Sequence, residues 1–411
     1  MAKTVSTTSL PMYNHGSNTW RSNPVAASGL YSLQATPPTY EGSFIPDTSP
    51  FGVSNVTYAE GTLGMSGTDK IYIAGHAQHH AVGEFNIPTL SASLDVNSLP
   101  IGSNAQVFRS VLDAPTGMEQ PTIKGIFEFG GQLIVGAHVY YDGGGSETKN
   151  FCVLEDADNI SGGAITGFFA ATGAAKSGGY VIPIPAAYQA SFGGKTHWCG
   201  MGVGMAIIAR ASNGPNLWAI NAQDIIDAST GGQSINAVPC SDYPHGVGTS
   251  LAGNDVYDGG PNISDNNMFN SVIWNHLSTN AGGFVVPGTR TVMFVGQNWS
   301  GEGTIQYKGT NELGITSGGY DTSLSYAKQN YYWLYDINDL VDGYNGTINP
   351  WDVKPYEHGQ FPFFPFSTTG RRIYGVTYDA ANARLYCYVR YGAFDRYNTN
   401  AGTIGVLNLG V

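Results

Sequence analysis

One pattern occurs five times in this chain: a short apolar run that ends on a polar side chain at the same point. The runs IYIAGH, LIVGAH, MAIIAR, VMFVGQ and LYCYVR end at His76, His138, Arg210, Gln297 and Arg390. Most are preceded and followed by further strand-like segments bounded by turn residues. A β unit repeated at intervals of 62 to 93 residues is typical of the blades of a β-propeller. The sequence therefore predicts an all-β fold, a five-bladed β-propeller.

Composition agrees with many tight turns and few helices. Only 12% of the residues are charged, against about 25% in an ordinary globular domain, and glycine and tyrosine are abundant. The net charge of −12 offers no basic surface for nucleic acid, so we expect no nucleic-acid partner. No apolar run is long enough for membrane insertion. The four cysteines are far apart, which predicts free, buried thiols.

Residues 1–39 differ from the rest of the chain. They contain four prolines and little strand alternation, which predicts a short, extended N-terminal arm before a propeller at 40–411. Either a neighbouring subunit orders this arm, or the arm folds back along its own domain. On the first alternative, the anchors buried by another subunit are the large apolar side chains Leu10, Met12, Tyr13, Trp20, Leu30 and Tyr31, with Leu33.

A strand without sequence neighbours follows the arm. Tyr40–Pro46 alternates as a strand does, and the chain ends directly after another strand, Thr403–Leu409. A ring of blades must join its first and last members, and closure removes exposed sheet edges. We expect Tyr40–Pro46 to close the propeller by completing the fifth blade beside Thr403–Leu409.

The five polar residues that end the runs form the first candidate site. If the runs are equivalent strands, His76, His138, Arg210, Gln297 and Arg390 lie at one height, near one rim of the ring. Convergent donors of this kind can bind a carboxylate or sugar hydroxyls. The alternative is that each strand becomes polar simply where it meets water.

Metal binding is the second possibility. His76, His79 and His80 form a dense histidine cluster, and imidazole is a common ligand of zinc and copper. A further ligand, Glu84 or His138, would be needed, and a solvated turn between strands is the alternative. The acidic loops at 155–159 and 254–267 lack the spacing of a calcium-binding loop. The sequence therefore predicts no metal site and no cofactor.

Several segments resemble one family in their order along the chain. They are PIPAAYQASFGG, LWAINAQDI, VVPGTRTVMFVG, YYWLYDINDLVDGYNGTINPWDVKPY and YGVTYDAANARLYCY. Over roughly residues 40 to 411 they are similar to propeller-like proteins of environmental bacteria and their phages. The resemblance implies a propeller fold and carries no catalytic residue over to this chain.

Enzyme signatures are mostly missing from the sequence. It has no nucleophile elbow and no phosphate-binding loop, so no catalytic residue is predicted. Paired carboxylates for glycoside hydrolysis converge only in space, and this alternative stays open.

Low Lys and Glu with high Tyr, Gly and Asn is typical of surface proteins, yet no secretory signal is recognisable. These features predict a non-enzymatic structural protein of a phage virion, in the tail or on the capsid surface, assembled in the host cytoplasm. Its expected partners are other virion proteins, copies of itself and a host surface glycan. The alternative is an extracellular carbohydrate-binding or carbohydrate-active propeller that acts on envelope glycans, for which exposed tyrosines are suited.

Overall fold

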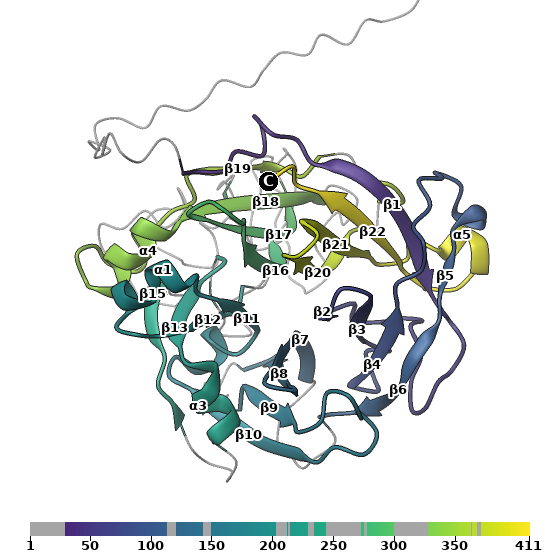
Figure 1. Ribbon diagram of the computed structural model, residues 1–411, viewed down its shortest axis with the longest axis horizontal. Coiled ribbons are helices and arrows are strands. Elements are labelled where there is room, and N and C mark those ends of the chain that lie inside the picture. Colours follow the sequence, from purple (N-terminus) through teal and green to yellow (C-terminus); the bar gives the residue numbers. More distant parts are fainter. Residues whose placement is uncertain are drawn as a thin grey trace, which may run out of the picture.

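The computed structural model describes residues 29–112, 121–142, 149–202, 212, 214–228, 234–243, 273–274, 278–299, 328–362, 364–367 and 371–411. Five β-sheets of four or five strands stand around a common axis (Figure 1). The fold is the five-bladed β-propeller that the repeat predicts.

Each blade is one sheet whose strands follow one another from the channel outward. The first blade contains β2 (Leu63–Ser66), β3 (Lys70–Ala74), β4 (Ala81–Asn86) and β6 (Asn104–Ser110). The second contains β7 (Pro121–Phe129), β8 (Gln132–Val139), β9 (Phe151–Leu154), β10 (Ile165–Ala171) and β14 (Ser234–Ile235). The third contains β11 (Tyr180–Pro183), β12 (His197–Gly200), β13 (Leu217–Ile220) and β15 (Val238–Ser241). The fourth contains β16 (Thr279–Val285), β17 (Thr291–Trp299), β18 (Lys328–Asp336) and β19 (Glu357–Gln360). The fifth contains β20 (Ile373–Asp379), β21 (Arg384–Val389), β22 (Thr403–Asn408), β1 (Thr39–Pro46) and β5 (Ile101–Gly102).

Helices in the described residues are short and occupy connections between strands. The α-helices are α1 (Ala186–Gln189), α3 (Ala222–Asp227), α4 (Ile337–Tyr344) and α5 (Phe394–Tyr397). The 3-10 turns are η1 (Val96–Ser98), η2 (Ala174–Lys176) and η3 (Ala190–Phe192). The longest, α4, begins after Asp336, whose carboxylate accepts a hydrogen bond from the amide of Asn338 as an N-cap.

Among the described residues, none of the helices combines the length and the apolar character that crossing a membrane requires.

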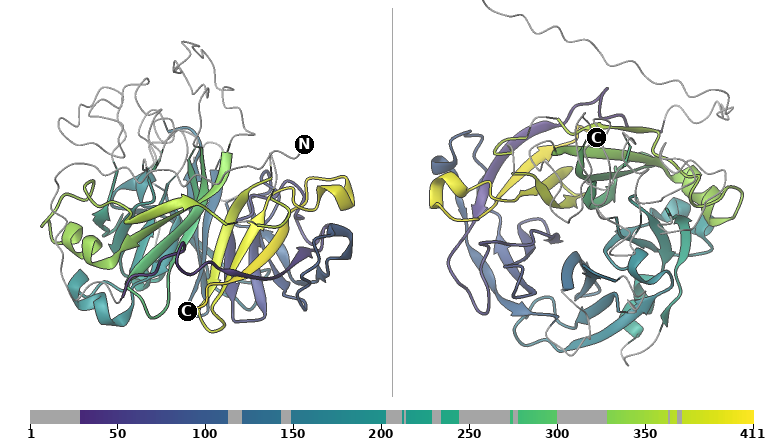
Figure 2. Two further views of the ribbon diagram at one scale, coloured as in Figure 1. Left: turned by 90° about the horizontal axis from the view of Figure 1, so that it is seen from above. Right: turned by 180° about the vertical axis from the view of Figure 1, so that it is seen from behind.

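The first three strands of each blade alternate in direction, which defines two rims, while the outermost pairs β1–β5 and β10–β14 are parallel. The innermost strands β2, β7, β11, β16 and β20 surround the central channel (Figure 1). We call the rim at which these strands begin the upper rim and the opposite one the lower rim. Because neighbouring strands are antiparallel, second strands end at the upper rim and β22 ends at the lower rim. The C-terminus accordingly lies at the bottom of Figure 2, left.

β1 occupies the position predicted for the segment after the arm. It pairs with β22 in antiparallel register from Thr39 opposite Asn408 to Phe44 opposite Ile404. Its inner residues are buried, with Phe44 and Ile45 both at 0% exposure. The first and last parts of the chain thus share one sheet. Whether the ring depends on this strand to fold stays a prediction, and deletion of residues 1–47, compared with deletion of residues 1–30, would test it.

The residues before β1 form a strap across the fourth and fifth blades. The amide of Tyr31 donates to Thr291 Oγ1 at 2.9 Å, and its hydroxyl donates to the carbonyl of Leu409 at 3.2 Å. Tyr31 and Leu33 are 4% and 2% exposed and pack in the core between these two blades. The prediction that another subunit buries Tyr31 is therefore wrong, because its own chain already does so.

The other predicted anchors divide into two groups. Leu30 is half-buried beside the strap. Leu10, Met12, Tyr13 and Trp20 lie outside the described residues, so their proposed contacts with another subunit stay a prediction.

Adjacent blades meet so closely that only glycine fits at several points. A Cβ atom on Gly375 would lie 1.8 Å from the carbonyl oxygen of Gly61 in the next blade. A Cβ atom on Gly136 would lie 1.9 Å from the carbonyl oxygen of Gly179. Glycine here permits backbone to contact backbone at the wall of the channel. Packing between blades thus explains part of the high glycine content.

Candidate functional site

Backbone pairing tests whether the predicted ring residues share a register. Their partners on the innermost strand or just before it are Ala59 for His76, Thr122 for His138, Thr279 for Gln297 and Arg372 for Arg390. In the second, fourth and fifth blades the innermost strand has a bulge just beyond this pair, at Ile123/Gly125, Asn280/Gly282 and Ile373/Gly375. The pairings agree with a common height for these four residues at the upper rim. Their role in binding a ligand stays a prediction.

The third blade departs from the predicted alignment. Its second strand is β12, which pairs with both β11 and β13, so assigning this position to the run at 205–210 was wrong. Arg210 itself lies outside the described residues. The segment HWCG is shorter and less apolar than MAIIAR, which explains why the pattern favoured the wrong run.

Two of the four ring residues are engaged by the protein itself. Gln297 is 3% exposed, and its Nε2 donates to the carbonyl of Ile373 in the next blade at 2.9 Å. The ring of His76 stacks on His79 with centroids 4.5 Å apart, and its Nδ1 accepts from the amide of Gln78 at 3.2 Å. These contacts give both residues a structural role.

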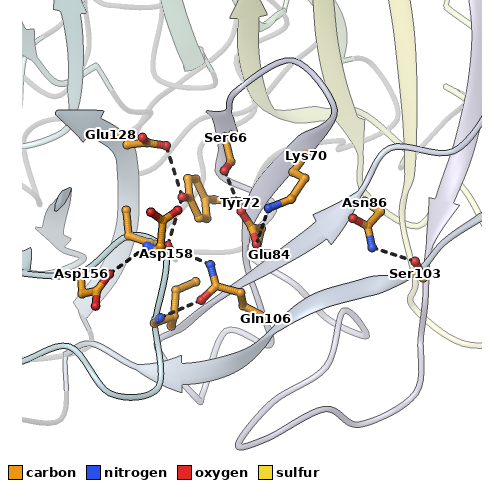
Figure 3. Close-up of polar contacts among 12 residues, drawn as sticks. Ser66, Lys70, Tyr72, Glu84, Asn86, Ser103, Gln106, Glu128, Asp156 and Asp158 are labelled. Carbon is orange, nitrogen blue, oxygen red and sulfur yellow. Dashed lines mark hydrogen bonds and ion pairs between the residues drawn. The ribbon is translucent and has the colours of Figure 1, made fainter. Parts of the chain in front are cut away.

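The suggested metal ligands do not converge. Glu84 is 1% exposed; its Oε1 accepts from Ser66 Oγ at 2.6 Å and its Oε2 lies 3.7 Å from Lys70 Nζ. Figure 3 shows these three residues together at the turn between β2 and β3, on the lower rim. Because His76 is at the upper rim, Glu84 cannot complete a site with it. The part of the chain that the structure describes contains no group of three or more side chains placed to hold a metal ion.

A buried Glu60 and a lysine lie at the upper end of the channel. Lys124 is the extra residue in the bulge of β7 and lines a channel of about 500 Å³. Glu60 Oε2 accepts from the amide of Ile123 at 2.7 Å, and its Oε1 is 3.8 Å from His80 Nδ1. Burial raises the pKa of Glu60 and lowers that of Lys124, and the opposite charge of each partner counteracts the shift. The two groups therefore help keep each other ionised.

Arg390 follows the end of β21 and lies close to two tyrosines. Its Cζ lies 4.9 Å from the ring centroid of Tyr374 and 4.8 Å from that of Tyr391, within the range of cation–π attraction. Tyr374 is the extra residue in the bulge of β20, and Tyr391 has a left-handed backbone with φ of 61°. Arg390 Nε is buried without a hydrogen-bond partner. The backbone irregularities thus place two aromatic rings near the guanidinium.

His138 completes the group. It is 6% exposed and its Nδ1 has no hydrogen-bond partner. Burial and then the positive charge of Lys124 lower the pKa of His138 to about 3, so the imidazole is neutral near pH 7. A neutral imidazole can donate or accept one hydrogen bond at each nitrogen according to its tautomer.

The channel mouth, which we define as Glu60, Lys124, His138, Tyr374 and Arg390, therefore combines charge, polarity and aromatic surface. The groups whose charges act on Lys124 are Glu60, Tyr374 and Arg390, so Glu60 is the only carboxylate among them. Glycoside hydrolysis requires two carboxyl groups on either side of the bond. Among these five residues Glu60 is the only such group, and Glu128 lines the channel farther along β7.

Sequence reasoning found two of these five residues. His138 and Arg390 belong to the repeated pattern, whereas Glu60, Lys124 and Tyr374 were missed. A lysine in the otherwise apolar segment IKGIF was the one available signal. The bulges that bring Lys124 and Tyr374 to the channel arise from strand pairing that the sequence does not reveal.

Comparison with known proteins gives distant structural similarity and no assignment. The sequence matches no protein-family model and no curated protein. A glycosyl hydrolase from Bacteroides ovatus is similar with a TM-score of 0.40 at 10% identity, over 90% of this chain and 89% of that one. An endo-arabinanase from Bacillus licheniformis has a TM-score of 0.36 at 10% identity, over 88% and 95% of the two chains. The Dos1 propeller has a TM-score of 0.30 at 8% identity, over 85% and 67%.

Proposed function

We propose that this protein is a binding propeller, without bond-breaking chemistry of its own, that recognises a saccharide at the channel mouth. The observation that carries the proposal is a pair of buried polar atoms without partners, His138 Nδ1 and Arg390 Nε, in two side chains that are both close enough to Lys124 for electrostatic interaction. A buried polar atom left unpaired costs about 1–3 kcal/mol. The hydroxyls of a bound sugar would supply the missing hydrogen bonds and would take the place of ordered waters.

Exposed tyrosines on the same rim support a saccharide as the ligand. Tyr140 and Tyr141 directly follow β8 and are 43% and 52% exposed. Tyr58 is 49% exposed, and its ring centroid lies 5.6 Å from that of His76. Tyrosine presents a rigid apolar face with a polar edge, which matches the two faces of a pyranose ring. Such side chains can extend a binding surface outward from the channel mouth.

Binding rather than catalysis follows from the charges at the site. Glu60 is held by a backbone amide and lies near His80 and Lys124, and the described residues of the channel mouth include no second carboxylate. Glycoside cleavage uses a pair of carboxyl groups, whereas the channel mouth contributes one, Glu60; Glu128 also lines the channel, near the other end of β7.

Saccharide binding is tested by applying the full-length protein to an array of bacterial envelope glycans and neutral and acidic oligosaccharides. We expect retention of a restricted set of glycans, and at least tenfold weaker binding after Tyr140→Ala together with Tyr141→Ala. Leu94→Ala is the control, because Leu94 is an apolar residue that is more exposed than either tyrosine, at 65%, on the connection between β4 and β5. Failure to retain any glycan, or an equal loss in the control, would refute the proposal.

Placement in a phage particle is a second proposal, and it rests on composition alone. A surface rich in tyrosine, glycine and asparagine suits a protein that works outside the cell while contacting other virion proteins. Mass spectrometry of purified particles would detect the protein in stoichiometric amounts. Its absence from particles, with secretion into the medium instead, would favour the extracellular alternative.

A further inference from the structure

We propose that the saccharide bound at the channel mouth carries a carboxylate, and that Arg390 is the residue that binds this group. The inference rests on the proposed function and adds the chemical class of the ligand. It follows from the unbalanced charge of Arg390, from the way its guanidinium is held, and from its neighbours.

Arg390 has neither a carboxylate nor a backbone carbonyl as a partner within the described residues, whereas Arg109 and Arg396, which also form no ion pair, donate to backbone carbonyls. Three arginines form ion pairs with carboxylates at 2.9, 2.6 and 2.5 Å, namely Arg290 with Asp336, Arg371 with Asp395 and Arg384 with Glu41. Within the described residues Arg390 forms none, although the chain has 30 acidic residues against 18 basic ones. A guanidinium remains charged at every pH at which a protein folds. The structure therefore leaves a permanent positive charge available to an external anion.

The two tyrosines orient this charge. The ring centroids of Tyr374 and Tyr391 lie 4.9 Å and 4.8 Å from Cζ, and these two contacts restrict the position of the side chain. A planar guanidinium binds a carboxylate through two parallel N–H···O bonds. Arg390 Nε is a buried donor without a partner in a side chain that is otherwise partly exposed, so a carboxylate that entered beside it would accept from Nε and from an Nη atom.

The surrounding groups favour an anion over a neutral sugar. Lys124 adds a second positive charge, and Glu60 balances only one of the two. His138 is neutral, so its unpartnered Nδ1 adds a hydrogen-bonding atom without a charge. A uronic acid offers one planar carboxylate and several hydroxyls on a single ring, which matches this combination.

The test compares acidic oligosaccharides with their own methyl esters. We would titrate the full-length protein calorimetrically with tetragalacturonate, a mannuronate tetrasaccharide and a hyaluronan tetrasaccharide, each also as its methyl ester, and with a κ-carrageenan tetrasaccharide that carries sulfate but no carboxylate. We expect at least one uronate to bind at least tenfold more tightly than its ester and than the sulfated probe. Binding should weaken as salt is raised, because screening reduces charge attraction.

Arg390→Gln should abolish this preference, and Arg390→Lys should restore only part of it, because lysine keeps the charge but loses the planar fork. Arg384→Gln is the matched control: Arg384 begins the same strand at the lower rim and is partly exposed. It should leave the affinity unchanged. If Arg390→Gln does not fold, the comparison of acid with ester on the unaltered protein still decides the question.

Each other outcome overturns a defined part of the proposal. Equal affinity for uronates and their esters, or binding of neutral glycans alone, would refute the carboxylate while leaving saccharide binding intact. Equal affinity for the sulfated probe would replace carboxylate recognition by general anion binding. Absence of binding to any saccharide would refute the proposed function itself.

Discussion

The buried His138 makes a quantitative prediction about acid stability. Its native pKa of about 3 lies well below the value of about 6.5 expected in the unfolded chain. Below pH 6.5 the unfolded state therefore binds a proton that the native state refuses, so the free energy of unfolding falls as the pH falls. At pH 5 this one residue lowers the free energy of unfolding by about 2 kcal/mol, and near pH 7.5 the effect vanishes.

The variant that isolates this term is His138→Gln. The fold already uses glutamine at the equivalent position of the fourth blade, where Gln297 is buried at 3% exposure. Between pH 7.5 and pH 5, the free energy of unfolding of His138→Gln should fall by about 2 kcal/mol less than that of the unaltered protein. Urea unfolding followed by tryptophan fluorescence at both pH values measures this difference directly.

Two further features of the experiment make it decisive. His197, whose pKa burial lowers to about 4, adds a pH dependence of the same sign in both proteins and cancels from the comparison. Gln297→Asn is the control, since it perturbs the equivalent site without a titrating group and should cost the same at both pH values. If His138→Gln and the unaltered protein lose equal stability on acidification, then His138 is not held neutral by its surroundings.

Three further predictions concern the fold. Deleting residues 1–28 should leave cooperative unfolding unchanged, whereas deleting residues 1–38 removes the buried strap and should lower the free energy of unfolding. Tyr31→Ala alone should lower it by about 3 kcal/mol, as measured by urea unfolding. Equal stability of the two truncated proteins would contradict the role of the strap. Gly375→Ala should prevent soluble folding, because its Cβ would lie 1.8 Å from a carbonyl oxygen of the first blade, while Gly29→Ala, with ordinary contacts at 3.5 Å, should express normally. All four cysteines are buried, and burial raises their pKa values, that of Cys152 to about 12. A thiol reagent at pH 8 should therefore label no cysteine of the native protein and all four after denaturation. Rapid labelling of the native protein would contradict this prediction.

The sequence alone determined the repeating part of the architecture. The second strand of a blade is covered on both faces, so it is a continuous apolar run, and it becomes polar where it leaves the core at the rim. That pattern identified the second strand in four blades and the register of His76, His138, Gln297 and Arg390. The partner of β1 was also predictable, because a strand with no neighbour in sequence must find one elsewhere.

Tertiary structure decided what the pattern could not carry. HWCG in β12 is a second strand because β11 and β13 lie beside it, although MAIIAR has the stronger apolar signal. Tyr31 is buried because the strap crosses two blades, where Tyr31 contacts Thr291 and Leu409, which are 260 and 378 residues away along the chain. Glu60, Lys124 and Tyr374 reach the channel mouth through backbone bulges and through the meeting of three different blades. Convergence of residues so distant in sequence depends on how the ring closes, and no local pattern of side chains encodes that geometry.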